Sequence, residues 1–213
     1  MTDPGAEPLL EFREVMRRLR AECPWKQQQT HRSLVRYLVE ELHETVDAIE
    51  TGTPDDLREE LGDLLLQVYF HAAIAEQDGL FDLDDVADGI VAKMRRRNPH
   101  VFGDVTLGGG DGGAGVSAAS AADVNELWES VKATEKRRDE ITDGIAPTLP
   151  ALLYADKVLD RLARAGRAAP TAGSGGDGSI GERLLALVAE AHDAGVDPEQ
   201  ELRDAVRVLL AQD

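Results

Sequence analysis

The segment from Thr53 to Asp78 constrains the fold most, because its apolar residues cover most of a helical circumference. The apolar residues at this spacing are Leu57, Leu61, Leu64, Leu65, Leu66, Val68, Tyr69, Phe70 and Ala73. A helix that is hydrophobic nearly all round needs cover from other elements, so we predict that this one is buried. Thr53 is a typical N-cap, Pro54 suits the first turn, and Gly79 ends the helix.

The rest of the chain also repeats its apolar residues at helical spacing, and it contains no alternating β-branched run of strand length. We therefore predict an all-α protein. Besides 54–78, helices are expected at 8–21, 32–51, 82–97, 123–139, 148–165, 181–194 and 198–211. The Gly/Ala/Ser-rich stretches at 108–122 and 168–179 are expected to be flexible loops.

The helices are predicted to form two parts, a catalytic domain at 1–145 and a helical tail at 146–213. Gly181-Glu182-Arg183-Leu184-Leu185 in the tail is weakly similar to Gly62-Asp63-Leu64-Leu65-Leu66. Ser179 and Leu209 stand where the first copy has Glu60 and Lys93. If the tail is a repeat, it has lost its charged chemistry, which places the chemistry before about residue 140.

The net charge and the cysteine content restrict which binding partners and which cellular compartment we expect for this protein. Asp and Glu number 41 against 23 Lys and Arg, and the formal net charge is −18, which disfavours a nucleic acid polymer as partner. The single Cys23 excludes a disulfide framework, and no N-terminal targeting segment or apolar run of membrane-spanning length is present. We expect a cytoplasmic protein without a membrane partner.

The segment 54–78 carries one narrow polar stripe, made of Glu60, Asp63, Gln67 and His71. Carboxylates in an otherwise buried helix are costly unless something compensates their charge. A bound cation is the simplest compensation. Gly62 lies beside this stripe and costs roughly 1 kcal/mol relative to alanine, which suggests a packing or ligand-approach role.

The preceding helix at 32–51 supplies a second set of carboxylates. Its apolar stripe is made of Leu34, Val35, Leu38, Val39, Leu42, Val46 and Ile49. Glu40 and Glu44 lie opposite this stripe and Glu41 lies at its edge, which by itself indicates only a solvated acidic face. The short Gly52–Thr53 turn, however, makes the two helices antiparallel neighbours.

This pairing predicts that Glu41 and Glu44 lie opposite Glu60 and Asp63. A site of four carboxylates without cysteine or a clear histidine pair suits Mg²⁺, or Mn²⁺, better than Zn²⁺. Helix-borne carboxylates around a metal ion are a known feature of helical bundles.

Several motifs in order resemble the MazG family of nucleoside triphosphate pyrophosphohydrolases, over residues 10–167. The motifs are Cys23-Pro24-Trp25, Gln29-Thr30-His31, Glu40-Glu41-x-x-Glu44, Glu59-Glu60-Leu61-Gly62-Asp63-Leu64-Leu65 and Arg96-Arg97-Asn98-Pro99-His100-Val101-Phe102. The resemblance implies an all-α helical bundle that forms a homodimer or higher homo-oligomer. It also implies that the tail is a degenerate, truncated second repeat.

The resemblance further implies magnesium-dependent hydrolysis of (d)NTPs to (d)NMP and pyrophosphate, as housecleaning of noncanonical nucleotides. The residues that match the family's metal ligands are Glu41, Glu44, Glu60 and Asp63. Glu40 and Glu59 match accessory acidic positions, and Glu40 is our candidate base. Lys26 and Asp56 depart from the family pattern, which commonly has Asp and a basic residue there.

Four further residues match positions that contact the nucleotide in the family, namely Lys93, Arg97, Trp128 and Lys132. The residues alone allow simpler interpretations: a basic surface near a helix C-terminus for the first pair and, on equal terms with nucleotide contact, core packing for Trp128. His31 and His71 are interpreted as structural or supporting groups. The alternative function is a non-catalytic helical module that binds nucleotide or metal and serves regulation or oligomerisation.

Overall fold

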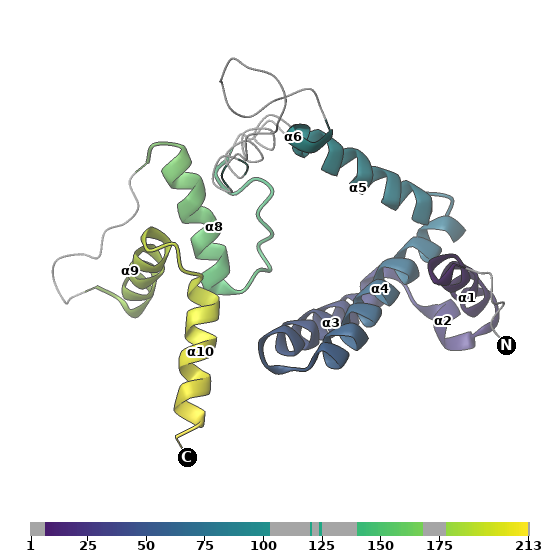
Figure 1. The fold of residues 1–213 in the computed structure, drawn as a ribbon, viewed down its shortest axis with the longest axis horizontal. Coiled ribbons are helices and arrows are strands. Elements are labelled where there is room, and N and C mark those ends of the chain that lie inside the picture. The colour runs from purple at the N-terminus through teal and green to yellow at the C-terminus, as the bar shows by residue number, and fades with distance from the viewer. Residues whose placement is uncertain (1–6, 103–119, 121–123, 125–139, 168–177, 213) are drawn as a thin grey trace. The chain divides into compact units, whose positions relative to one another are not determined.

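The computed structural model describes residues 7–102, 120, 124, 140–167 and 178–212 (Figure 1). Every regular element within these ranges is a helix, so the predicted all-α class is confirmed. The helices are α1 (Pro8–Glu22), α2 (Pro24–Gln28), α3 (His31–Thr51), α4 (Pro54–Gln77), α5 (Leu83–Arg97), α6 (Pro99–Phe102), α8 (Ala151–Arg164), α9 (Ile180–Asp193) and α10 (Pro198–Leu210). The predicted loop at 108–122 and the predicted helix at 123–139 lie almost entirely outside the described residues.

Contacts divide the chain into two compact units, an N-terminal unit of residues 1–132 and a C-terminal unit of residues 133–213. Each is described by itself. The catalytic domain at 1–145 stays a prediction, because contacts alone do not show which residues the activity needs.

The centre of the N-terminal unit is the antiparallel pair of α3 and α4 (Figure 1). Both helices begin with a capping box, formed by Thr30 with Ser33 and by Thr53 with Asp56. At the turn between them, a Cβ on Gly52 would lie 2.8 Å from the Ala48 backbone, so only glycine fits. The tight turn keeps the facing sides of the two helices in register.

The acidic residue at position 56, where the family commonly has a basic one, is explained by the structure of the turn before α4. The Thr53 amide donates to its carboxylate at 2.7 Å, and this bond together with that of the Thr53 hydroxyl holds the pKa of Asp56 below its usual range. The acidic residue noted as a departure from the family therefore stabilises the start of α4.

The core of the N-terminal unit forms where α1 packs on the C-terminal half of α4. Its buried residues are Met16, Leu34, Tyr69, Phe70 and Ile74. The Tyr69 hydroxyl donates to the Leu9 carbonyl at 3.0 Å, and the buried Arg20 guanidinium donates to Gln77 at 2.7 Å. These bonds satisfy polar groups that burial would otherwise make costly.

The apolar residues of α3 and α4 are less covered than the sequence predicts. On α4, Leu61 and Val68 are 51% and 45% exposed. On α3, Leu34 is the one member of the predicted apolar stripe that is fully buried, and α3 instead buries Thr45 and Ala48. The prediction that α4 is buried holds for its C-terminal part but is wrong at Leu61 and Val68 in the single chain, because the helices packed on α4 cover only part of its circumference.

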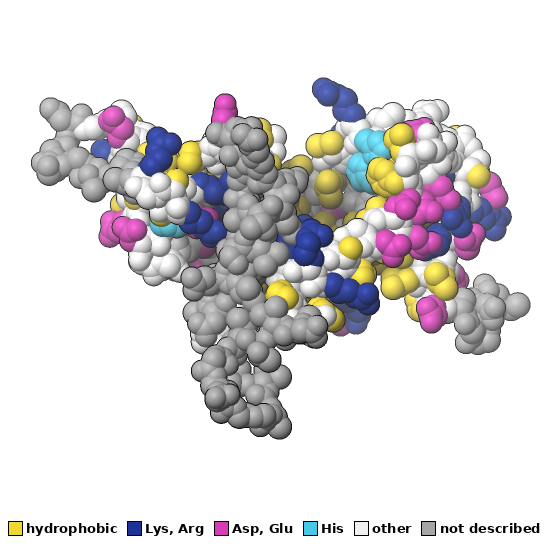
Figure 2. All heavy atoms as spheres, turned by 90° about the horizontal axis from the view of Figure 1, so that it is seen from above, with side chains coloured by type: hydrophobic (Ala, Val, Ile, Leu, Met, Phe, Trp, Pro, Cys, Tyr) yellow, Lys and Arg dark blue, Asp and Glu magenta, His cyan; other side chains and the backbone are white. Residues whose placement is uncertain are grey.

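The exposed apolar residues of α3 are Val35, Leu38, Val39, Leu42 and Ile49. On the face drawn in Figure 2, apolar side chains of this unit lie open to solvent beside acidic ones. No helix in the described part of the chain is both long and apolar enough to cross a membrane.

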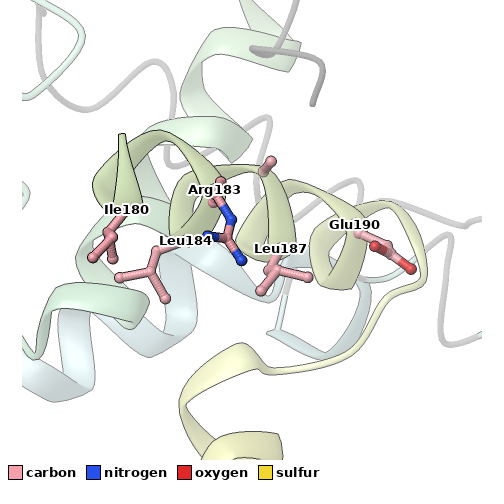
Figure 3. A pocket seen from close by; sticks show the side chains of 6 residues that line it. Ile180, Arg183, Leu184, Leu187 and Glu190 are labelled. Carbon is pink, nitrogen blue, oxygen red and sulfur yellow. The ribbon is translucent and has the colours of Figure 1, made fainter. Parts of the chain in front are cut away.

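The C-terminal unit packs α8, α9 and α10 around a small core of Leu159, Val188 and Ala189. His192 on α9 lies 2.8 Å from Asp156 on α8. The outer face of α9 borders a pocket lined by Ile180, Leu184 and Leu187 with Arg183 and Glu190 near them (Figure 3). The relation of this unit to a second repeat stays a prediction.

Candidate metal centre

Three carboxylates meet across the α3–α4 pair. Glu41 comes from α3, and Glu60 and Asp63 come from α4, three residues apart and therefore on the same face. One oxygen from each lies within 4.8 Å of the others, and all three residues are half-buried. This separation is short enough for a single ion to contact all three groups.

The electrostatics of this cluster favour a bound cation. Burial raises the pKa of Glu41 above its usual range, and the nearby charges of Asp63, Glu44 and Glu60 raise it further. Burial likewise raises the pKa of Glu60, with the charges of Glu44 and Asp63 adding to the effect. A divalent cation would remove both this repulsion and the burial penalty, and an all-oxygen donor set fits Mg²⁺ or Mn²⁺.

The remaining predicted acidic residues lie around this group. Glu44 is exposed and is not among the three clustered oxygens, although its charge acts on Glu41 and Glu60. Glu40 is exposed and forms an ion pair with Arg36, one turn earlier on α3, at 3.3 Å. The assignment of Glu44 as a ligand and of Glu40 as a base stays a prediction.

The predicted nucleotide contacts are only partly described. Arg97 is buried near the C-terminal end of α5, and Lys93 is half-buried one turn earlier. Trp128 and Lys132 lie outside the described residues. The role of all four in nucleotide binding therefore stays a prediction.

Lys26, noted as a departure from the family, packs on aromatic rings. Its Nζ lies 4.8 Å from the centre of the Phe70 ring and 5.5 Å from that of Trp25. These cation–π contacts stabilise the docking of α2 on α4. This role cannot be predicted from sequence spacing, because Phe70 is distant from Lys26 in the chain.

The histidines noted in the sequence contact each other. The Nδ1 atoms of His31 and His71 are 2.7 Å apart, and their rings are stacked with an angle of 2° between planes. Burial and the nearby His31 lower the pKa of His71, which favours the neutral form of the His71 ring. Gln67, one turn before His71, is buried, and its side chain hydrogen-bonds to the Glu41 carboxyl. The sequence places Gln67 on the polar stripe but indicates no role for it.

Comparison with known proteins decides the family. The model of the MazG nucleotide pyrophosphohydrolase domain matches residues 29–102, which include α3, α4, α5 and all three clustered carboxylates. The nucleoside triphosphate pyrophosphohydrolase of Escherichia coli is 38% identical over 199 residues, which are 89% of this chain and 71% of that protein. This chain belongs to the MazG family. The predicted membership and the hydrolase class are thereby confirmed.

Other MazG relatives differ in length. An uncharacterised 26.1 kDa protein of Streptomyces cacaoi is 47% identical over 96% of this chain and 80% of its own length. The nucleoside triphosphate pyrophosphohydrolase of Mycobacterium tuberculosis is 43% identical over 75% of this chain, but this match spans only 46% of that protein. The crystal structure of a MazG-related protein from Thermotoga maritima aligns with 58% of this chain at 24% identity and a TM-score of 0.46.

Proposed function

We propose that this protein hydrolyses nucleoside triphosphates to the monophosphate and pyrophosphate in a magnesium-dependent reaction. The observation that carries the proposal is the half-buried group of Glu41, Glu60 and Asp63. Relatives named nucleoside triphosphate pyrophosphohydrolase support the choice of substrate class.

In the proposed site, Glu41, Glu60 and Asp63 hold the cation and Glu44 completes the set at the exposed side. A bound Mg²⁺, or Mn²⁺, neutralises phosphate charge and lowers the pKa of a water molecule. Glu40 orients that water or accepts its proton after leaving Arg36, with which it is paired at 3.3 Å. Lys93, Arg97, Trp128 and Lys132 contact the nucleotide.

Because the protein is strongly negative, binding of a triphosphate requires positive groups close to the site. At −18 the protein as a whole repels a triphosphate, so binding depends on the metal and on basic residues near it. The proposed biological task is the removal of noncanonical nucleotides in the cytoplasm.

The proposed assembly is a homodimer or higher homo-oligomer. Val35, Val39 and Ile49 on α3 and Leu61 on α4 are about half exposed or more in the single chain, on the central helices of the N-terminal unit. A group of exposed apolar residues on two adjacent helices is typical of a surface that another subunit covers.

The activity is tested with purified protein, Mg²⁺ and a panel of NTPs and dNTPs that includes modified bases. We expect pyrophosphate release from at least one member and none after chelation of the metal. Release from no member would contradict the proposal. A nucleotide that raises the melting temperature without product would instead favour the non-catalytic binding module.

The site is tested with Glu41→Gln and Asp63→Asn, which remove charge at nearly constant volume. Both variants should fold and lose turnover. Unchanged turnover in both would exclude these carboxylates from the metal site.

A further inference from the structure

A buried amide lies beside the carboxylate group. Gln67 is only 6% exposed and follows Asp63 by one helical turn on the same face of α4. Its side chain acts on the Glu41 carboxyl as a hydrogen-bond donor, which opposes the rise in the pKa of Glu41. Its Oε1 atom is buried and has no hydrogen-bond partner among the described residues.

The orientation of this amide has chemical consequences. A glutamine side chain ends in a donor and an acceptor, and only the donor end stabilises a carboxylate. If the amide turned over, Oε1 would face the Glu41 oxygens and add to the repulsion that already exists there. A buried side chain with few rotamers can therefore hold the Glu41 carboxylate, provided that its own orientation is fixed.

The stacked histidine pair supplies a means of fixing it. His71 follows Gln67 by a further turn of α4, and its buried Nε2 likewise has no partner within the described part of the chain. Its Nδ1 lies 2.7 Å from Nδ1 of His31, so one of these two atoms carries the proton and the other accepts it. When His31 donates, the neutral His71 ring carries its proton on Nε2.

In that tautomer the two unpartnered atoms, Nε2 of His71 and Oε1 of Gln67, are complementary hydrogen-bonding groups. Nε2–H of His71 is a donor, Oε1 of Gln67 is an acceptor, and the two residues are neighbours on successive turns of one helix face. A hydrogen bond between these two atoms would give each of them a partner. The hydrogen bonds then run in one direction, from His31 to His71, from His71 to Gln67, and from Gln67 to Glu41.

We propose that Gln67 is a positioning residue that holds the Glu41 carboxylate toward Glu60 and Asp63, with the His31–His71 pair setting the direction of its amide. The inference rests on the proposed function, because a bound divalent cation is what the positioned carboxylate serves. Supporting hydrogen bonds to a ligand side chain commonly govern metal affinity.

The test is Gln67→Met, which fills the buried space and removes both polar atoms. The matched control is Thr45→Val, because Thr45 on α3 is also buried and its hydroxyl donates only to the Glu41 backbone carbonyl one turn earlier, at 2.7 Å. Binding of Mn²⁺ alone is measured by electron paramagnetic resonance on the full chain. Gln67→Met should weaken it about 10- to 100-fold, as loss of a supporting bond to a ligand does, and Thr45→Val should leave it unchanged.

A double variant separates positioning from direct metal ligation. In a Glu41→Gln background, Gln67→Met should cause no additional loss of Mn²⁺ affinity, because its effect passes through Glu41. An equal loss in both backgrounds would overturn the positioning role. If Gln67→Met fails to fold by circular dichroism, Gln67→Asn, which withdraws the amide by one methylene, replaces it with the same expectation.

Failure of the proposed function and failure of the positioning role give different results in these experiments. Wild-type protein that binds no Mn²⁺ or Mg²⁺ would refute the proposed function and this inference together. Wild-type protein that binds metal, with Gln67→Met binding equally well, would refute the positioning role alone. His71→Leu should weaken metal binding less than Gln67→Met, and unchanged affinity would remove the histidine pair from the proposal.

Discussion

The α3–α4 pair and the α8–α10 unit are built from similar amphipathic helices, yet their acidic residues have different surroundings. In the C-terminal unit Asp156 pairs with His192 at 2.8 Å, and Asp160 pairs with Arg164 at 2.9 Å. In the N-terminal unit, Glu41, Glu60 and Asp63 face one another and form no ion pair with any described basic residue. An acidic helix therefore becomes a candidate metal site only where carboxylates of two helices converge without basic partners.

The largest expected effect is on turnover. Asp63→Asn should lower it more than ~100-fold, because the loss of an outer partner of a metal ligand alone costs about 10- to 100-fold. The matched change Asp156→Asn in the C-terminal unit should leave turnover within about twofold, since its carboxylate only pairs with His192. Pyrophosphate release under saturating Mg²⁺ measures both, and similar losses would erase the contrast between the regions.

The next effect concerns pH and metal. The pKa of Glu60 is raised in the folded protein, so the folded state binds this proton more tightly than the unfolded state does. Charged Glu60 therefore destabilises the folded state most at pH values above its folded-state pKa. This destabilisation disappears as the pH falls from the folded-state pKa to the lower unfolded-state pKa. Without metal, Glu60→Gln should melt at a higher temperature than wild type near neutral pH, and at the same temperature in acid.

Added Mg²⁺ should reverse this order near neutral pH, because the ion stabilises the charged form that only wild type has. Thermal unfolding with and without Mg²⁺ measures the difference. A wild type that melts above Glu60→Gln in the absence of metal would contradict the assigned repulsion.

A smaller effect is expected on assembly. Ile49 on α3 is 64% exposed and Leu187 on α9 is 61% exposed, so the two units offer matched apolar positions. Ile49→Glu should shift the protein toward monomers in sedimentation, because a charge at a subunit interface loses its hydration. Leu187→Glu should not change the sedimentation. The opposite pattern would place the subunit interface on the C-terminal unit.

The smallest effects concern the helix caps, in which the two units are alike. Thr53 caps α4 and Ser179 caps α9, each through a capping box. Replacement of either by alanine should lower the free energy of unfolding by about 1 kcal/mol in urea titration. Thr53→Ala should also reduce turnover slightly because α4 carries two of the carboxylates, whereas Ser179→Ala should not. Equal turnover losses would indicate that the C-terminal unit takes part in catalysis.

Much of the fold could be predicted because helix signals are local. The expected helix at 8–21 is observed at Pro8–Glu22, and the one expected at 54–78 is observed at Pro54–Gln77. Caps, prolines and glycines act within one turn, so their effect can be read without the tertiary structure. The family, too, follows from ordered motifs that comparison with known proteins confirms.

The surroundings of individual side chains could not be predicted in this way. Glu40 and Glu41 are adjacent in sequence, yet Glu40 pairs with Arg36 while Glu41 faces Glu60 and Asp63. The contacts of Lys26 with Phe70 and of Gln67 with Glu41 likewise depend on how the helices are rotated and docked. Helical periodicity indicates which residues share a face but not which neighbour that face meets.

The sequence by itself determined the helical class, the boundaries of the main helices, the family and the candidate carboxylates, because each depends on local propensity or on ordered motifs. Tertiary structure decided that one oxygen each of Glu41, Glu60 and Asp63 come within 4.8 Å of one another, that the buried Gln67 hydrogen-bonds to Glu41, and that the apolar face of α3 is left open in the single chain. These features arise from packing between segments far apart in the chain. Packing changes the charge, hydration and hydrogen bonding of each side chain, and chemistry at a metal site depends on all three.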